Sequence, residues 1–218
     1  MLHLSGVNAD RLDLKYIQET KSIDFTDITT RDLYKQKLVD TFGDKANVSN
    51  LDYCSFNYSN GGCGLRYGDY TSANVLSNAS SLFTIDNIRI PKEMSLTFTA
   101  ANAYGNSPYY WLLFWICMSI NGVKKHILSI QDASNGSSTN NFYIYIVNQT
   151  ITGKPSYSKH TFTIREEDFQ YLLDNDYKDV ENKERCNIIF HAPTITTAST
   201  GNRVNINPVY IHNFSITY

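Results

Sequence analysis

The alternation of apolar and polar positions predicts a chain built mostly of β-strands. Segments of five to twelve residues alternate with period two or are apolar throughout, and loops rich in Gly, Asn, Ser and Thr separate them. About ten strands with two short helices indicate an all-β fold, an antiparallel two-sheet sandwich. The expected strands are 11–18, 51–58, 81–90, 94–101, 109–120, 123–130, 141–148, 160–164, 186–192 and 209–218.

The most apolar segment, Tyr109 to Ile120, predicts a central strand. Its twelve residues are too few for a membrane-spanning helix, which needs about 20. The Asn121-Gly122 pair that follows favours the left-handed backbone of a tight hairpin turn. Both alternating faces of the strand are apolar, so we expect cover on both sides. One face should fill the space between the sheets, and a helix, the N-terminal segment or a neighbouring subunit should cover Trp111 and Trp115 on the other.

Two segments carry the signals of short helices. The first begins after Thr29 or Thr30, either of which can cap it, and ends at Gly43. The second lies at 165–175, where acidic residues occupy the first turn and apolar residues share one face. We expect residues 1–45 to form an N-terminal segment, with one strand and the first helix, that packs on a sandwich domain formed by residues 46–218.

The charge of the chain limits the classes of partner, and its cysteines bear on whether a disulfide forms. The formal net charge is -2, and Lys and Arg are scattered, so neither nucleic-acid binding nor membrane insertion is expected. The first residues lack the basic and apolar regions of a secretory signal. Cys54 and Cys63 flank a turn-rich segment, which leaves a disulfide between them open, although reduced thiols are favoured.

The motifs of common enzyme and metal sites are missing from the sequence. It contains no GxSxG, HExxH or P-loop pattern and no GxGxxG after a strand. The glycines of "NGGCGLRYGDY" predict a turn or bulge. Cys186 and His191 are five positions apart, so a single strand places them on opposite faces. We therefore expect a non-enzymatic protein with no catalytic residue, no metal site and no cofactor.

Aromatic residues in the predicted loops are the remaining candidates for a binding surface. The chain contains 16 Tyr. Loop tyrosines beside Asn, Asp and Ser can stack on sugar rings or supply rigid contact area for a protein, and they can equally pack against the rim of the sandwich. The candidate ligand-binding residues are Tyr67, Asp69, Tyr70, Tyr104, Tyr109 and Tyr110.

Three segments carry a resemblance to known sandwiches: "SLFTIDNIRIPKEMSLTFTAA", "WLLFWICMSINGVKKHILSI" and "VYIHNFSITY". In this order they resemble the strands of laminin-G-like and concanavalin-A-like domains, over about the last 140 residues. The resemblance implies a jelly-roll-like sandwich. The Asn-, Tyr-, Ile- and Lys-rich composition without a catalytic motif is also similar to that of bacteriophage tail, baseplate and head-fibre proteins, which often end in a trimeric β-sandwich that recognises a host surface.

These observations favour a non-enzymatic viral structural or fibre domain, located in the virion, that binds a host-surface glycan or protein. The resemblance to fibre proteins implies a homo-oligomer, with a trimer favoured. The alternative is a lectin-like, carbohydrate-binding module of a secreted or surface protein, which would be extracellular. A third hypothesis is a sandwich-fold glycan hydrolase or lyase that uses an acid such as Asp69.

Overall fold

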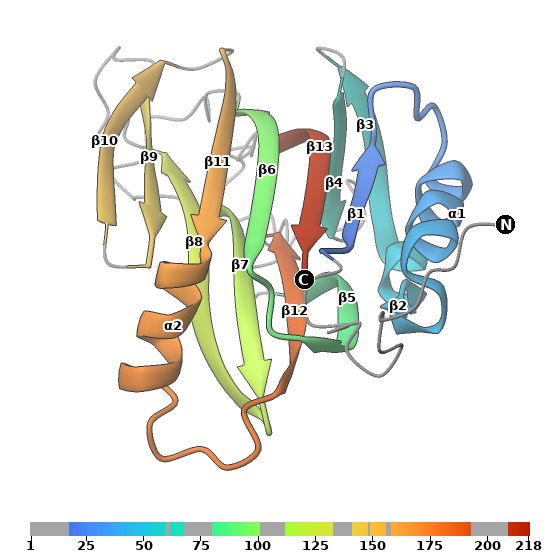
Figure 1. Cartoon of the computed structure of the whole chain (residues 1–218). Coiled ribbons are helices and arrows are strands. Elements are labelled where there is room, and N and C mark those ends of the chain that lie inside the picture. Colours follow the sequence, from blue (N-terminus) through green and yellow to red (C-terminus); the bar gives the residue numbers. More distant parts are fainter. Residues whose placement is uncertain are drawn as a thin grey trace, which may run out of the picture.

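The computed structural model describes residues 18–59, 62–67, 80–100, 112–132, 141–147, 149–155, 158–192 and 209–218. These residues form two antiparallel sheets packed face to face, with a helix near each lateral edge (Figure 1). The predicted all-β, two-sheet sandwich with two short helices is confirmed. The helices are α1 (Arg31–Phe42) and α2 (Glu166–Asn175), and short 3-10 turns span Gly43–Lys45 and Ser49–Tyr53.

Thirteen strands in the described residues make up the two sheets. Sheet A contains β1 (Thr20–Asp24), β3 (Cys54–Ser59), β4 (Gly62–Tyr67), β6 (Glu93–Ala100), β11 (Lys159–Arg165) and β13 (Val209–Thr217). Sheet B contains β2 (Ala46–Asn47), β5 (Ser80–Arg89), β7 (Leu112–Ile120), β8 (Val123–Asp132), β9 (Asn141–Ile146), β10 (Gln149–Pro155) and β12 (Arg185–Ala192).

Nested strand pairing defines the topology as a jelly roll. Strand β4 pairs with β13, β5 with β12, β6 with β11, and β7 with β8, so early strands pair with late ones in reverse order. The chain thus forms one long antiparallel hairpin that is coiled, so that successive strand pairs belong alternately to sheet A and sheet B. This is the jelly-roll arrangement. Strands β9 and β10 extend one edge of sheet B beyond β8.

The central strand β7 and its turn match the sequence prediction. Residues Asn121 and Gly122 have φ angles of 49° and 83°, and they join β7 to β8 as a tight hairpin. The face of β7 that points between the sheets belongs to the central core, and it consists of Phe114, Ile116, Met118 and Ile120. Residues 109–111 of the predicted strand lie outside the described residues.

Phe190 of β12 is the centre of the aromatic core. Its ring stacks on Phe83 of β5 at 4.2 Å and meets Phe214 of β13 edge-on at 4.9 Å. It also contacts Phe114 of β7 at 6.2 Å. Since Phe214 belongs to sheet A and the other three rings to sheet B, Phe190 joins the two sheets.

Helix α1 begins and ends where the sequence predicts. The Thr30 hydroxyl accepts a hydrogen bond from the Leu33 backbone N–H at 3.2 Å, and Gly43 follows the helix with φ +62°. Its buried side chains, Tyr34, Leu38 and Phe42, recur every four residues and therefore share one face. That face packs into the core at the edge of the sandwich beside β1 and β2 (Figure 1).

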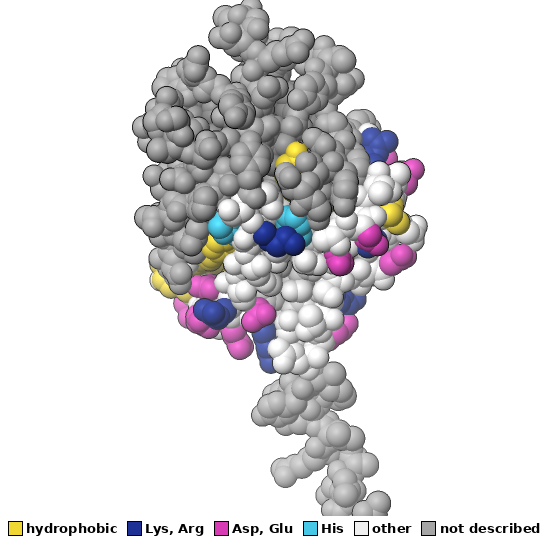
Figure 2. All heavy atoms as spheres, turned by 90° about the horizontal axis from the view of Figure 1, so that it is seen from above, with side chains coloured by type: hydrophobic (Ala, Val, Ile, Leu, Met, Phe, Trp, Pro, Cys, Tyr) yellow, Lys and Arg dark blue, Asp and Glu magenta, His cyan; other side chains and the backbone are white. Residues whose placement is uncertain are grey.

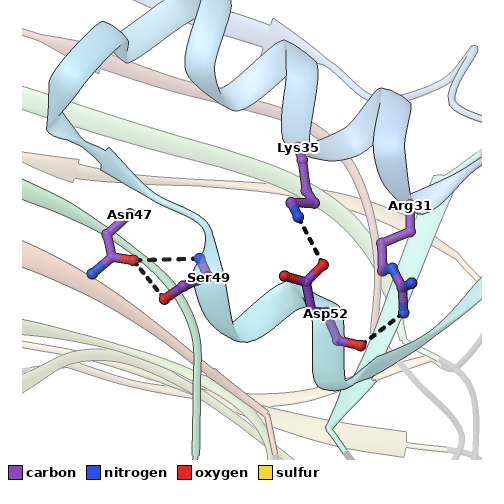
Figure 3. A network of polar contacts seen from close by, with 5 residues as sticks. All are labelled: Arg31, Lys35, Asn47, Ser49 and Asp52. Carbon is purple, nitrogen blue, oxygen red and sulfur yellow. Dashed lines mark hydrogen bonds and ion pairs between the residues drawn. The ribbon is translucent and has the colours of Figure 1, made fainter.

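Aromatic and polar contacts hold α1 in place. Tyr34 stacks on Phe25 at 4.6 Å and contacts Phe83 at 6.1 Å, so this one ring links the helix to both sides of the core. On the outer side, Lys35 Nζ lies 2.7 Å from Asp52 Oδ1, and Arg31 donates to the Asp52 carbonyl at 2.9 Å (Figure 3). The hydrogen bond from Lys35 holds the pKa of the Asp52 carboxyl below its usual value.

Helix α2 is also confirmed. The Asp168 carboxylate accepts a hydrogen bond from the Arg165 backbone N–H at 3.0 Å, and Phe169 and Leu172 are buried in the core. Just after the helix, the fully buried Tyr177 donates its hydroxyl hydrogen to the Met118 carbonyl at 2.6 Å. This bond fastens the end of α2 to β7.

Several strand predictions need correction. Residues 11–17 of the predicted first strand lie outside the described residues, and the first strand within the described part of the chain is β1, which pairs with β13. Gly62 and Gly64, predicted in a turn or bulge, belong to β4, where pairing with β3 and β13 outweighs the low strand propensity of glycine. Residues 152–155, predicted as a loop, complete the edge strand β10, where proline is tolerated.

The other boundaries shift by a few residues. Residues 51–53, predicted as the start of a strand, form the end of a 3-10 turn, and the strand begins at Cys54. The division between an N-terminal segment and a sandwich domain at residue 45 stays a prediction.

We predict that Phe190→Ala lowers the free energy of unfolding by about 3–5 kcal/mol, because it removes the ring that joins both sheets and leaves a cavity. Urea unfolding measures this change. The matched control is Tyr171→Ala, since Tyr171 is 42% exposed on α2, and its cost should stay within about 0.5 kcal/mol. Equal costs for the two variants would contradict the central role of Phe190.

We predict that Gly122→Ala destabilises the β7–β8 hairpin by about 1 kcal/mol, because an L-residue is strained at φ +83°. A Cβ at this position meets no atom within 4 Å, so the cost comes from the backbone and not from a clash. Gly122→Asn should cost less, since Asn tolerates the left-handed conformation. If thermal unfolding ranks Asn below Ala, the backbone explanation is wrong.

Candidate functional site

The described strand ends that flank the predicted binding residues lie at one end of the sandwich. Ala100, which ends β6, is opposite Val209, which begins β13. In sheet B, Leu112 at the start of β7 is opposite Gln131 near the end of β8. Ala192 and Ser80 pair in the same way at the end of β12 and the start of β5. We call this end of the sandwich, at the top of Figure 1, the loop end.

The predicted binding residues belong to segments that connect these strand ends. Tyr67 is the last residue of β4, which runs antiparallel to β13 and therefore finishes at the loop end. Nothing is described of its side chain. Asp69, Tyr70, Tyr104, Tyr109 and Tyr110 lie outside the described residues. The jelly-roll topology thus brings the ends of their flanking strands together, although the sequence separates them widely.

Figure 2 looks onto the loop end. On the described part of this face, acidic and basic side chains are interspersed among uncharged ones, so neither sign of charge dominates there.

A polar pocket lies at the opposite end of the sandwich, on the outer face of sheet B beside the β7–β8 turn. Its volume is about 530 Å³. We call it the asparagine pocket, because four of its nine lining residues are Asn. The lining residues are Asn87, Ser119, Asn121, Gly122, Asn182, Glu184, Arg185, Cys186 and Asn187.

The backbone of the asparagine pocket has an unusual conformation. Asn87, Asn121 and Asn182 have φ angles of 51°, 49° and 53°, and they are the non-glycine residues with positive φ in the described part of the chain. Asn is one of the few residues that tolerate this region. All three line the same pocket, although they come from β5, the β7–β8 turn and the segment before β12.

Hydrogen bonds fix this backbone in place. Asn187 Oδ1 accepts from the Asn87 backbone N–H, and Arg185 Nη1 donates to the Asn87 carbonyl, both at 2.8 Å. Asn121 Nδ2 donates to the Glu181 carbonyl at 2.6 Å. Segments that are up to 100 residues apart in the chain are therefore tied together around the pocket.

A second, smaller groove lies on the outer face of sheet A, with a volume of about 260 Å³. Its polar lining residues are Ser22, Asp24, Ser95, Thr97, Asn213 and Ser215. Hydroxyl groups on this face bind one another: the Thr97 and Thr161 oxygens are 2.8 Å apart, and those of Ser95 and Thr163 are 3.2 Å apart. Much of its hydrogen-bonding capacity is thus already used within the sheet.

The outer face of β7 carries Trp115, which is 5% exposed. Its indole stacks with the His191 ring at 5.1 Å and with the His126 ring at 6.5 Å. Trp115 is therefore covered, as expected, and two imidazoles from β12 and β8 contribute. It belongs to a small cluster with Cys117 and Ile189, whereas the buried side chains of α1 and α2 belong to the central core. Trp111 lies outside the described residues, and cover by a further segment or subunit stays a prediction.

The cysteines do not form a reactive site in the described residues. Cys186 belongs to the central core while His191 stacks on Trp115 outside it, which confirms that the two lie on opposite faces of β12. Burial raises the pKa of the Cys117 thiol to about 11 and that of the Cys186 thiol to about 12. Both are therefore weak nucleophiles at neutral pH.

The strand register also excludes a disulfide between Cys54 and Cys63. Cys54 is opposite Tyr67 and Cys63 is opposite Tyr58, so the two cysteines are offset by four residues along the β3–β4 pair. At about 3.4 Å per residue this offset is about 13 Å, whereas a disulfide needs Cα atoms within about 7 Å. The register therefore agrees with reduced thiols at both positions.

The asparagine pocket cannot be recognised as a site in the sequence. Only its Asn121-Gly122 turn carried a local signal, and that signal indicated a hairpin. Asn87, Asn182 and Asn187 are each unremarkable in the sequence, since the pairing of β5 with β12 is what brings them together.

Within the described residues, no group of three or more His, Cys, Asp or Glu side chains is placed to hold a metal ion. None of the helices described is both long enough and apolar enough to cross a membrane. The fold and the pocket thus define a jelly-roll sandwich with a polar surface pocket. No protein-family model matches this chain, and neither a curated protein nor a solved structure matches it significantly.

We predict that Cys117 and Cys186 react with iodoacetamide at least about 100-fold more slowly in the folded protein than in guanidinium, because burial keeps both thiols protonated. Peptide mapping by mass spectrometry follows each cysteine separately. In guanidinium the two residues should react at similar rates, which serves as the internal control. Equal rates in the folded and unfolded protein would contradict the raised pKa values.

Proposed function

We propose that this protein is a non-enzymatic virion or fibre domain that binds a host-surface glycan or protein through its loop end. The observation that carries the proposal is the convergence of strand ends: the connections after β4, β6, β8, β10 and β12 all start from the same end of the sandwich. These connections include the candidate residues Asp69, Tyr70, Tyr104, Tyr109 and Tyr110.

A rigid sandwich that presents several loops at one end suits recognition. Loops carry binding residues because they tolerate sequence change, while the sheets fix where they begin and end. Tyrosine supplies a large contact area at a low entropic cost, and it can stack on a sugar ring. Jelly rolls occur in viral capsid and lectin domains, which supports both the proposed class and its alternative by analogy of fold.

The proposed virion domain is a homo-oligomer, with a trimer as the favoured form. The apolar cluster on the outer face of sheet B, formed by Trp115 and Cys117 of β7 with Ile189 of β12, is at most 6% exposed within one chain. The oligomer is therefore supported by the resemblance to fibre proteins and not by an uncovered apolar surface.

The alternative is a lectin-like module of a secreted or surface protein. The asparagine pocket favours it, because hydroxyl, amide and charged groups line the pocket, and these groups match sugar hydroxyls. The two hypotheses share glycan binding and differ in assembly and location.

We expect the protein to bind members of a printed glycan array, and the double change Tyr109→Ala with Tyr110→Ala to reduce that signal at least tenfold. The reason is the loss of two stacking surfaces, each worth about 1 kcal/mol or more. Tyr171→Ala is the matched control, since Tyr171 is exposed on α2 and should leave binding unchanged. A thermal melt shows whether each variant is folded.

Sedimentation velocity separates the two classes. A stable oligomer favours the virion domain, and a monomer that binds glycans favours the lectin-like module. A monomer with a blank array would count against both.

A further inference from the structure

We infer that the asparagine pocket is a binding site for a neutral sugar residue of a glycan, separate from the loop end. The inference does not depend on the proposed binding through the loop end, because the described lining of the pocket lies at the opposite end of the sandwich.

The size of the pocket suits a ligand. Sites for small molecules in proteins usually span about 300–1,000 Å³. At about 530 Å³ the asparagine pocket lies inside this range, while the groove on sheet A, at about 260 Å³, lies below it. The asparagine pocket is therefore the better candidate of the two.

Polar groups that lack a partner line the pocket. Ser119 is only 7% exposed, yet its hydroxyl makes no hydrogen bond to any other described residue. The side-chain amide of Asn182 and the carboxylate of Glu184, both solvent-exposed, likewise have no hydrogen-bond or ion-pair partner among the residues described. The Ser119 hydroxyl is not one of the fully buried side-chain atoms without a partner, so it is open to the pocket and available to a ligand there.

The hydrogen-bonding groups of the pocket match a ligand that carries hydroxyl groups. An amide side chain offers both donors and an acceptor, and a hydroxyl group also donates and accepts. A sugar residue presents several hydroxyls on one rigid ring, so it can bond to the amides, to the Ser119 hydroxyl and to the Glu184 carboxylate together. A ligand that only accepts hydrogen bonds would leave the acceptors of Asn182 and Glu184 unpaired.

The charge of the pocket favours a neutral ligand. Its lining contains one acidic residue, Glu184, and one basic residue, Arg185, so the formal charges cancel. The Arg185 guanidinium is also engaged by the Asn87 carbonyl at 2.8 Å. Neither an acidic sugar nor a cation finds an excess of opposite charge here.

A peptide fits the position less well than a sugar. An extended peptide binds a sandwich most simply by adding a strand to a sheet edge. The pocket instead lies over β5, β7 and β12. Strands β7 and β12 have neighbours on both sides in sheet B, and only β5 pairs on one side at this level, since β2 reaches no further than Ile85. Within the described lining there is also no large apolar side chain to anchor a peptide residue.

The test compares changes at the pocket with matched changes elsewhere. Ser119→Ala removes the hydroxyl that lines the pocket, and Asn182→Gly removes the amide while glycine accepts the positive φ. Each should weaken binding to neutral glycans on the array about three- to tenfold, and the two together more than tenfold, as expected for lost hydrogen bonds. The control Ser215→Ala, in the groove on sheet A, should leave binding unchanged.

A second measurement locates the site. In ¹⁵N spectra, adding glucose, galactose, mannose or N-acetylglucosamine at millimolar concentration should shift the side-chain amide signals of Asn182 and Asn187. The double change Ser119→Ala with Asn182→Gly should remove the shift of the remaining Asn187 side-chain amide, while the rest of the spectrum stays that of the folded protein.

Three results would overturn the inference. One is the absence of shifts in these amides with all four sugars together with a blank array. Another is glycan binding that is lost with Tyr109→Ala and Tyr110→Ala but kept in both pocket variants, which would leave the loop-end proposal standing. The third is binding only to acidic glycans or to peptides.

Discussion

The packing of Phe190 is the interaction on which the rest of the structure depends. It contacts Phe83 and Phe114 within sheet B and Phe214 across the sandwich in sheet A. Phe83 then contacts Tyr34, and Phe214 contacts Phe42, so the same aromatic network reaches both ends of the buried face of α1. Aromatic rings bury large apolar areas and prefer stacked or edge-on contacts. The spacing of the sheets and the position of the helix therefore follow from one set of contacts.

The nested pairing of strands around this core gives the two ends of the sandwich different characters. The nested pairs run from β4·β13, the outermost, to β7·β8, the innermost, and of these four pairs the innermost is closed by a two-residue turn. We call the end of the sandwich that contains this turn the hairpin end. At the hairpin end, short turns and α2 pack tightly, with Tyr177 bonded to Met118. At the loop end, the connections leave from strand ends that are already fixed. A rigid pocket is therefore expected at the hairpin end, and sequence variation is best tolerated at the loop end.

The sequence predicts the structural features that neighbouring residues determine, and it does not reveal those that depend on pairing between distant strands. The period of β7, the Asn121-Gly122 turn, the Thr30 cap and the acidic first turn of α2 are all set by neighbouring residues, and the structure contains each of them. Strand β4 was missed because Gly62 and Gly64 have low strand propensity; Gly64 is held by Tyr210 of β13, 146 residues away, and Gly62 by Ser59 of β3. The asparagine pocket was missed for the same reason. Its residues meet only after β5, β7 and β12 have paired.

The residue types at the left-handed positions of the pocket bear on whether their side chains serve the fold or a ligand. A left-handed position is most easily filled by glycine, which has no Cβ to clash, and Gly122 and Gly43 fill two such positions in the described structure. Asn87, Asn121 and Asn182 retain a side chain instead. The Asn121 amide has a structural task, since it bonds to the Glu181 carbonyl. The side-chain amides of Asn87 and Asn182 are exposed and make no hydrogen bond to another described residue. The tolerance of asparagine for the left-handed region already suits these positions, and a bound hydroxylated ligand would give the two amides, which glycine lacks, a further role.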